Sequence, residues 1–288
     1  MSPAGPLDGA ARIRPDGWLR APLTTDLDQA EAQARQLVYV HHPQALGPLR
    51  CLTARYRTAA FALGTPPTRL LKRHADEAAY LGETLAYQIL ADEDVLPVLH
   101  GHSDATRTLV VDYLDQGADL TVPHMFDELV RLVATIHTAS ARWHPVVAEA
   151  MSPWRVEALR NAPPPQWITR HDPWRRLMDL VSAAHGPEHV PLGHLDLKSD
   201  HVRRGADGRL LLIDVETLRP DLTGLPDLIT LVHLAGDAIP DLPPSWVRRG
   251  YLRHINSLGA RWTDTALRSA LVAFADATGL HSLHGAET

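Results

Sequence analysis

The sequence predicts an α+β protein with two lobes, a small β-rich N-terminal lobe and a larger, mainly helical C-terminal lobe. Short apolar runs separated by His, Pro and Gly fill residues 38–73, a pattern typical of a strand meander. Beyond residue 120, apolar residues recur every three to four positions, which is typical of amphipathic helices. This change places the N-terminal lobe at 1–111, a hinge at 112–117 and the C-terminal lobe at 118–288.

The N-terminal lobe is expected to combine strands with two helices. Residues 26–37 are predicted to form a short helix capped by Thr24 or Thr25. The meander then begins with LVYV (37–40), and GTPP (64–67) is the turn between its last two strands. A helix is predicted at 75–90, followed by a strand, a turn and a strand that leads into the hinge.

The C-terminal lobe is expected to be helical except around residues 193–217. Its apolar spacing predicts helices at 125–140, 154–161, 173–184, 226–236, 244–258 and 264–278.

Composition excludes several classes of function. The 288 residues are 45% hydrophobic and 22% charged with a formal net charge of −6, values typical of a globular protein. The basic residues are scattered, which argues against binding to nucleic acid. Residues 1–24 are rich in Pro and Gly without a signal-like apolar core, no stretch resembles a membrane span, and Cys51 is the only cysteine. We therefore expect a cytoplasmic protein with neither membrane nor nucleic-acid partners.

A predicted hairpin supplies the first candidate site residues. GADG (205–208) is a turn signal between HVRR and RLLLID, so the chain folds back and brings Asp214 near the loop that carries Asp196. Two converging carboxylates repel each other unless a cation lies between them or one takes up a proton. Lys198 or a metal ion can supply that cation.

The scarcity of lysine identifies a second candidate. Of 28 basic residues only Lys72 and Lys198 are lysines. A lone lysine in a strand usually marks a sheet edge. A compact ammonium, however, fits against a phosphate or a single carboxylate in a tight site better than the forked guanidinium of arginine. The next helix offers Glu77 and Glu83 as partners for Lys72, although a single glutamate is by default a surface charge.

Two segments resemble kinase motifs. HLDLKSDH (194–201) resembles the catalytic loop H-R-D-L-K-x-x-N, and LLIDVE (211–216) resembles the strand that ends in a metal-binding aspartate. The hairpin, IDVE and GLPDL (224–228) together most resemble the aminoglycoside phosphotransferase-like family of small-molecule kinases. The resemblance extends over residues 52–236. It implies a protein-kinase-like fold and transfer of the γ-phosphoryl group of ATP or GTP, with Mg²⁺, to a hydroxyl group of a small molecule.

The resemblance also implies roles in catalysis. Asp196 would be the catalytic base, Lys198 would neutralise charge on the transferring phosphoryl group, and Asp214 would bind the metal. Asp227 would brace the catalytic loop from below.

Nucleotide contacts are implied in the same way. Lys72 would contact the nucleotide phosphates and pair with Glu83, which is preferred over Glu77 for its distance from Pro97. The hinge would offer backbone groups to the purine from Asp112, Tyr113 and Leu114.

Two departures from the family pattern stand out. His201 occupies the position of a metal-ligating Asn, and an imidazole suits Mg²⁺ less well than an oxygen ligand. The site therefore tolerates His201, favours Mn²⁺ or has lost its chemistry. No glycine-rich loop is present, since the candidate turn HHPQALGPL (41–49) contains only Gly47.

Alternatives of other classes stay open. The chain is either a phosphotransferase or a kinase-like protein that binds a nucleotide or ligand without transfer. A metal-dependent hydrolase is a further alternative, because the seventeen histidines include His194, His201, the pair 41–42 and the HSLH sequence at 281–284.

The acceptor is not defined by the sequence. The resemblance places the acceptor pocket in 141–190 and 244–284, and we expect a small hydroxylated molecule, an antibiotic such as an aminoglycoside or a metabolite. A protein acceptor is not expected, because no activation-segment pattern follows Asp214.

Overall fold

A computed structural model of the chain describes residues 23–220 and 223–279. The chain divides into two compact units. The first comprises Met1–Gln116 with Arg203–Thr217, and the second comprises Gly117–Val202 with Leu218–Thr288. The first boundary falls within the predicted hinge. The segment Arg203–Thr217 belongs to the first unit, whereas the sequence assigned it to the C-terminal lobe.

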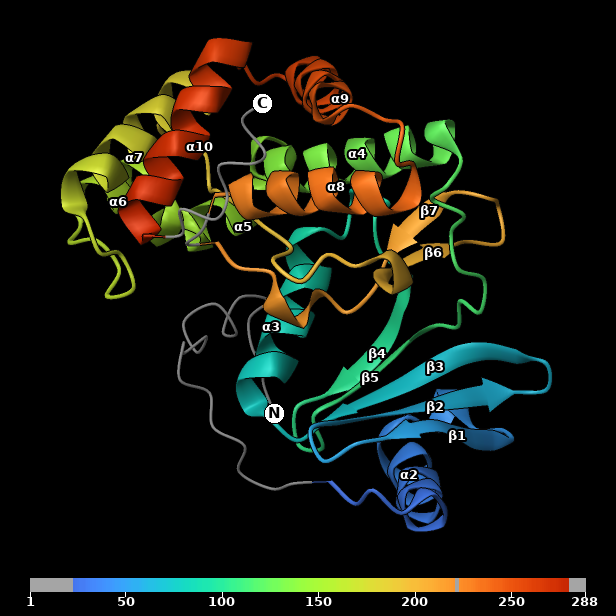
Figure 1. Cartoon of the computed structure of the whole chain (residues 1–288). Helices are drawn as coiled ribbons and strands as arrows, with labels where there is room; N and C mark the ends of the chain where they lie inside the picture. The colour runs from blue at the N-terminus through green and yellow to red at the C-terminus, as the bar shows by residue number, and fades with distance from the viewer. Residues whose placement is uncertain (1–22, 221–222, 280–288) are drawn as a thin grey trace. The chain divides into compact units, whose positions relative to one another are not determined.

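The first unit contains a five-stranded antiparallel sheet of order β1-β2-β3-β5-β4 (Figure 1). Its strands are β1 (Leu49–Ala54), β2 (Thr58–Gly64), β3 (Pro67–His74), β4 (Leu99–Ser103) and β5 (Thr108–Asp112). The predicted turn at 64–67 joins β2 to β3, and the positive φ of Gly64 (100°) is one that glycine adopts without strain. Since β3 pairs with both β2 and β5, it is an interior strand.

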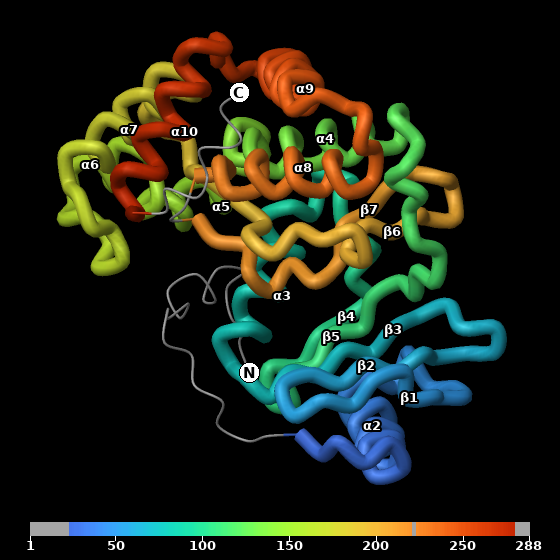
Figure 2. Tube along the Cα trace, in the orientation of Figure 1, coloured from blue at the N-terminus to red at the C-terminus, as the bar shows by residue number. Residues whose placement is uncertain are grey.

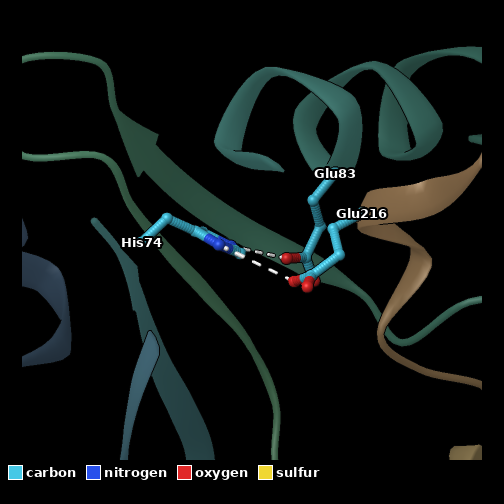
Figure 3. A group of neighbouring side chains, drawn as sticks. All are labelled: His74, Glu83 and Glu216. Carbon is cyan, nitrogen blue, oxygen red and sulfur yellow. Dashed lines mark hydrogen bonds and ion pairs between the residues drawn. The ribbon is translucent and has the colours of Figure 1, made fainter. Parts of the chain in front are cut away.

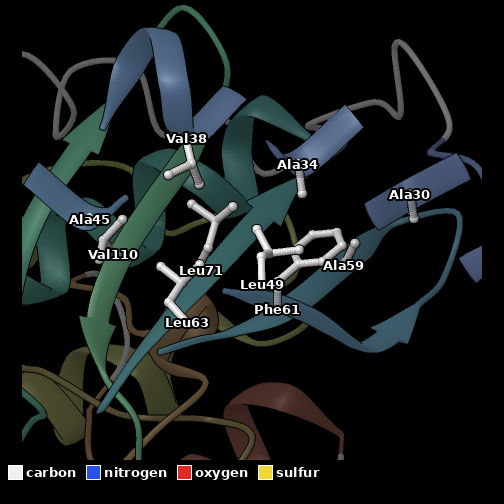
Figure 4. Close-up of a cluster of buried hydrophobic side chains, with 10 residues drawn as sticks. All are labelled: Ala30, Ala34, Val38, Ala45, Leu49, Ala59, Phe61, Leu63, Leu71 and Val110. Atoms are coloured by element: carbon white, nitrogen blue, oxygen red, sulfur yellow. The ribbon is translucent and has the colours of Figure 1, made fainter. Parts of the chain in front are cut away.

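Helix α2 (Leu27–His41) packs on one face of this sheet (Figure 4). Its Ala30, Ala34 and Val38 recur every four residues and bury against a cluster that includes Phe61 and Leu71. The N-cap is Asp26, whose side chain accepts a hydrogen bond from the Gln29 amide, and not Thr24 or Thr25. The prediction of a strand at 37–40 is wrong, because Val38 continues the buried stripe of the helix.

Helix α3 (Glu77–Ile89) approaches the 3₁₀ turn η5 (Val215–Thr217) through Gly82. A Cβ at Gly82 would lie 2.5 Å from the backbone oxygen of Glu216, so only glycine permits this approach. The predicted hairpin is present as β6 (Val202–Arg204) and β7 (Leu210–Leu212), with Gly208 in its turn at φ 85°. The 3₁₀ turn η1 (Pro43–Ala45) precedes β1.

The second unit is helical, as predicted. Its helices are α4 (Pro123–Thr138), α5 (Pro145–Ala150), α6 (Val156–Asn161), α7 (His171–His185), α8 (Leu225–Ala238), α9 (Pro244–Ser257) and α10 (Asp264–Thr278). Short 3₁₀ turns lie between α4 and α5 at η2 (Ala139–Arg142), between α5 and α6 at η3 (Ser152–Trp154), and before β6 at η4 (Ser199–His201). Figure 2 shows α7 beside α10 and α4 beside α9, pairs that pack extensively. No helix within the described residues has the length and apolar character needed to cross a membrane.

Candidate active site

Lys72 is surrounded by three carboxylates in the first unit. Its Nζ donates hydrogen bonds to Asp214 Oδ1 at 2.6 Å and to Glu216 Oε2 at 3.0 Å, and it lies 3.0 Å from Glu83 Oε2. The lysine comes from β3, Glu83 from α3, and the other two residues from the segment after β7. The interior position of β3 and the close approach of α3 to η5 therefore hold this cluster together.

The opposite charges in this cluster stabilise one another. Burial alone would lower the pKa of Lys72, but Glu83, Asp214 and Glu216 together raise it well above its usual value. Burial would likewise raise the pKa of Glu83, but the Lys72 charge and a hydrogen bond from His74 lower it below its usual value. Lys72 and Glu83 thus form a buried ion pair at neutral pH.

Two members of the cluster were not predicted from the sequence, His74 and Glu216 (Figure 3). His74 Nε2 lies 2.7 Å from Glu83 Oε2, and its Nδ1 lies 3.7 Å from Glu216 Oε2. Each of these residues follows a predicted site residue by two positions. For His74 this spacing was a usable signal, because alternate residues of a strand share a face.

The predicted hinge follows β5, and its first residues are fixed by hydrogen bonds within the first unit. The Asp112 amide donates to Val98 O at 3.1 Å, and the Tyr113 amide donates to Thr68 O at 3.0 Å. The Asp112 carboxylate accepts from His100 Nε2 at 2.7 Å. Beside the hinge lies a cavity of about 650 Å³, lined among others by Thr68, Asp112, Tyr113, Leu114, Gln116, Arg204 and Asp207.

The loop of the second unit that carries Asp196 is anchored to Asp227, at the start of α8. The side chain of Asp227 is 1% exposed and accepts hydrogen bonds from the His194 amide at 2.6 Å and the Leu195 amide at 2.8 Å. His137 Nε2 lies 3.0 Å from the same carboxylate, and its Nδ1 lies 2.8 Å from the Tyr251 hydroxyl. Burial would raise the pKa of Asp227, but the hydrogen bond and charge of His137, the charge of His194 and the Leu195 amide lower it below its usual value.

The predicted catalytic side chains follow this anchor. Leu195 adopts φ 66°, a strained value for a residue with a Cβ, and directs the chain into Asp196. The Asp196 side chain is 39% exposed, and Lys198 Nζ donates to its Oδ2 at 2.8 Å. His201 is buried and its Nδ1 donates to the carbonyl of Asp196 at 2.9 Å. His201 therefore holds the loop from its C-terminal side.

The structure groups Lys72, Glu83 and Asp214 within the first unit, and Asp196, Lys198 and His201 within the second. The predicted proximity of Asp196 to Asp214 stays a prediction. Asp214 itself adopts φ 55°, and Asp196 directly follows Leu195. Each of the two predicted carboxylates is therefore at or next to a residue in the left-handed region.

Two other expectations concern the candidate turn at 41–49 and the histidines of the hydrolase alternative. The turn between the first two strands is at 55–57, not at 41–49, and its sequence is Arg-Tyr-Arg without glycine. Among the described residues, the group of side chains that could hold a metal ion is His74, Glu83 and Glu216, and it includes none of the histidines of the hydrolase alternative. The HSLH sequence at 281–284 lies outside the described residues.

Comparison with known proteins decides the fold. No model of a protein family matches the chain, and no curated protein matches it. Among solved structures, an ethanolamine kinase from Plasmodium vivax matches 91% of this chain and 84% of its own, with a TM-score of 0.53 and 12% identity. A choline/ethanolamine kinase family protein from Mesorhizobium loti matches 88% of this chain and 84% of its own, with a TM-score of 0.50 and 18% identity.

An aminoglycoside phosphotransferase from Alicyclobacillus acidocaldarius matches 84% of this chain and 82% of its own, with a TM-score of 0.50 and 12% identity. The chain has a protein-kinase-like fold. At these identities the likeness establishes the fold alone, and it confirms the predicted α+β class. In this kinase-like chain, the β3–α3 ion pair and the anchored loop are the two features from which a function can be argued.

Proposed function

We propose that the chain transfers the γ-phosphoryl group of ATP or GTP to a hydroxyl group of a small molecule. The observation that carries this proposal is the contact of Lys72 with both Glu83 and Asp214. Lys72 and Asp214 are 142 residues apart in the chain, yet their side chains meet at 2.6 Å. A buried lysine held by carboxylates from separate elements is suited to receive phosphates, and perturbed charges of this kind concentrate at functional sites.

The hinge constrains how a purine is bound. The amides of Asp112 and Tyr113 already donate to Val98 and Thr68, so they are not open to a ligand. In our proposal the purine uses the carbonyl of Asp112 together with the amide and carbonyl of Leu114. Lys72 then contacts the α- and β-phosphates.

The metal would be held by Asp214 and His201. The Asp214 side chain is 41% exposed and offers the oxygen ligand that Mg²⁺ prefers. His201 also fits, because its Nδ1 donates to a carbonyl, and a metal-ligating imidazole usually carries its proton on the nitrogen that makes such a bond. Mg²⁺, or Mn²⁺ as a better match to imidazole, would shield the charge of the triphosphate.

Asp196 would act as the catalytic base. The acceptor oxygen attacks the γ-phosphorus, the bond from this phosphorus to the β-phosphate oxygen breaks, and the hydroxyl proton passes to Asp196. Lys198, whose Nζ donates to Asp196 Oδ2 at 2.8 Å, would neutralise negative charge on the transferring phosphoryl group. For the acceptor, the similar structures suggest choline, ethanolamine and aminoglycoside antibiotics as the first hydroxylated molecules to test.

Two variants test this assignment. Calorimetry with ATP and GTP, each with Mg²⁺ or Mn²⁺, measures nucleotide affinity. Asp214→Asn is expected to weaken nucleotide binding and turnover together, because it removes a ligand charge. Asp196→Asn is expected to leave nucleotide affinity within about threefold and to lower turnover by roughly 10²–10⁴-fold.

Three outcomes would contradict the proposal. Equal loss of nucleotide affinity in both variants would reject the division of roles. Wild-type turnover in Asp196→Asn would reject the phosphotransferase mechanism. Nucleotide binding without transfer to any acceptor tested would favour the alternative of a kinase-like binding protein.

A further inference from the structure

His74 occupies an unusual position beside the buried ion pair. It is the last residue of β3, and its side chain is 0% exposed. It follows Lys72 by two positions, so both side chains project from the same face of the strand. Both reach the same atom: Glu83 Oε2 lies 2.7 Å from His74 Nε2 (Figure 3). The same oxygen lies 3.0 Å from Lys72 Nζ.

The hydrogen-bond pattern of the ring indicates what it contributes. A carboxylate only accepts hydrogen bonds, so the ring donates from Nε2 to Glu83. The Nδ1 atom is buried and has no hydrogen-bond partner among the described residues. Burying a ring nitrogen that has no hydrogen-bond partner lowers the free energy of unfolding. An apolar ring of the same shape would not have this cost. The bond from Nε2 to Glu83 is therefore the gain that a histidine brings to this position.

A metal ion is the alternative explanation for this cluster. His74, Glu83 and Glu216 offer ligand atoms within 4.8 Å of one another. However, Oε2 of each glutamate also lies 3.0 Å from Lys72 Nζ. A cation on these oxygens would stand beside a charged ammonium and be repelled by it. The Lys72 ammonium is therefore the cation of this cluster.

We propose that His74 is a positioning residue that fixes the Glu83 carboxylate and, through it, holds Lys72 at the nucleotide site. Nothing in the resemblance assigns this position a role. The inference rests on the proposed function for its effect on nucleotide binding, while the link from His74 through Glu83 to Lys72 stands on the geometry.

The need for a second donor follows from the other partner of Lys72. In the proposed function Lys72 gives up its 2.6 Å bond to Asp214 and turns to the phosphates, because Asp214 then holds the metal. The Glu83 carboxylate is the contact that keeps Lys72 in place during this exchange. Since α3 and β3 are separate elements, a bond from β3 to that carboxylate keeps it directed at the lysine.

Three substitutions at His74 separate the hydrogen bond from the shape of the ring. His74→Gln places an amide nitrogen near the position of Nε2, whereas His74→Asn is shorter and places it near Nδ1. His74→Phe keeps a ring and removes the donor. We expect nucleotide affinity within about threefold of wild type for Gln, and about tenfold or more weaker for Asn and Phe. In a Glu83→Ala background, which has no acceptor at this position, His74→Phe is expected to have no further effect on nucleotide affinity.

The lysine content of the chain offers a readout that does not depend on nucleotide. With only two lysines, ¹⁵N-lysine labelling gives two side-chain signals in the NMR spectrum, and Lys198→Arg identifies the signal of Lys72. We expect the Lys72 ammonium signal to be retained in His74→Gln and to shift or broaden in Asn and Phe. Thermal unfolding of each variant shows whether it is folded, and the Gln and Asn pair carries the comparison if Phe does not fold.

Two results would overturn this inference. An unchanged Lys72 signal and unchanged affinity in His74→Phe would make His74 a packing residue. Equal changes in Gln and Phe would mean that the ring, and not the donor, matters. Absence of nucleotide binding in the wild type would instead reject the proposed function, and the lysine signal would still test the link from His74 to Lys72.

Discussion

Replacing Asp227 with asparagine should weaken the hydrogen bonds that anchor the loop carrying Asp196, without changing a side chain that we propose to react. The carboxylate is buried and accepts three hydrogen bonds: Oδ2 from the His194 amide and His137 Nε2, and Oδ1 from the Leu195 amide. Asparagine has one acceptor oxygen, and its NH₂ group faces a donor on the other side. In either orientation of the amide, at least one buried donor loses its acceptor.

The expected loss follows from this count. One buried unsatisfied donor costs about 1–3 kcal/mol, and the remaining bonds lose the gain of an ionised acceptor, so we expect Asp227→Asn to lower the free energy of unfolding by about 3 kcal/mol. The pKa of Asp227 is lowered in the folded state, so its stabilisation is present above the unfolded value and is lost as pH falls through the folded one. The measurement therefore belongs at neutral pH.

Urea denaturation of the variant and of a matched control measures the effect. Asp200→Asn makes the same chemical change in the same loop, where the side chain is 74% exposed, and should alter stability by less than about 0.5 kcal/mol. Turnover of Asp227→Asn should also fall. The hydrogen bonds that the His194 and Leu195 amides donate to Asp227 hold the strained backbone at Leu195, and this backbone leads to Asp196. Equal stabilities of the two variants would refute the reasoning.

Two further predictions concern other parts of the chain. Gly82→Ala places a Cβ 2.5 Å from the backbone oxygen of Glu216, so we expect a loss of about 1–3 kcal/mol in urea denaturation and weaker nucleotide binding. Gly236→Ala in α8 meets nothing within 4 Å and should be neutral or stabilising, and equal effects of the two changes would contradict this account. Burial lowers the pKa of His185 to about 4 and that of its stacked neighbour His189 well below its usual value. Because the unfolded chain binds these protons near pH 6.5 and the folded chain does not, stability should be full above that pH. It should then fall by about 1.4 kcal/mol per pH unit for each histidine towards pH 4. Denaturation curves between pH 7.5 and 4.5 measure this slope, and an unchanged slope after replacing both residues would show that they are not its cause.

Regular elements were predictable wherever one side of the element is buried over its full length. In α7 the buried residues Trp174, Leu177, Met178 and Val181 recur at helical spacing, and both the helix and its extent follow from them. The four residues at 37–40 misled because three consecutive apolar residues with a β-branched or aromatic side chain favour a strand locally. These residues are helical because Val38 packs against the sheet. That contact joins segments distant in sequence, so the four residues alone could not predict it.

The residues of the candidate site likewise include some that the sequence could predict and some that it could not. Lys72, Glu83 and Asp214 could be named because their spacing matches a known pattern, and the structure brings them together. His74 was passed over because a single polar residue in a strand is by default an edge or packing residue. His137 and Tyr251 could not be assigned to the loop anchor, since His137 contacts Asp227, and Tyr251 contacts His137, only through packing between separate helices.

The charges around Lys72 connect the observed cluster to the need for a metal in the proposed reaction. One ammonium serves three carboxylates, those of Glu83, Asp214 and Glu216. If Lys72 turned to a triphosphate, Asp214 and Glu216 would lose their cation at the moment when further negative charge arrived. Carboxylates and phosphates at such distances repel one another unless a cation lies between them. In the proposed function, the nucleotide would therefore enter together with a divalent cation, and Asp214, whose contact with Lys72 would be given up, would bind that cation.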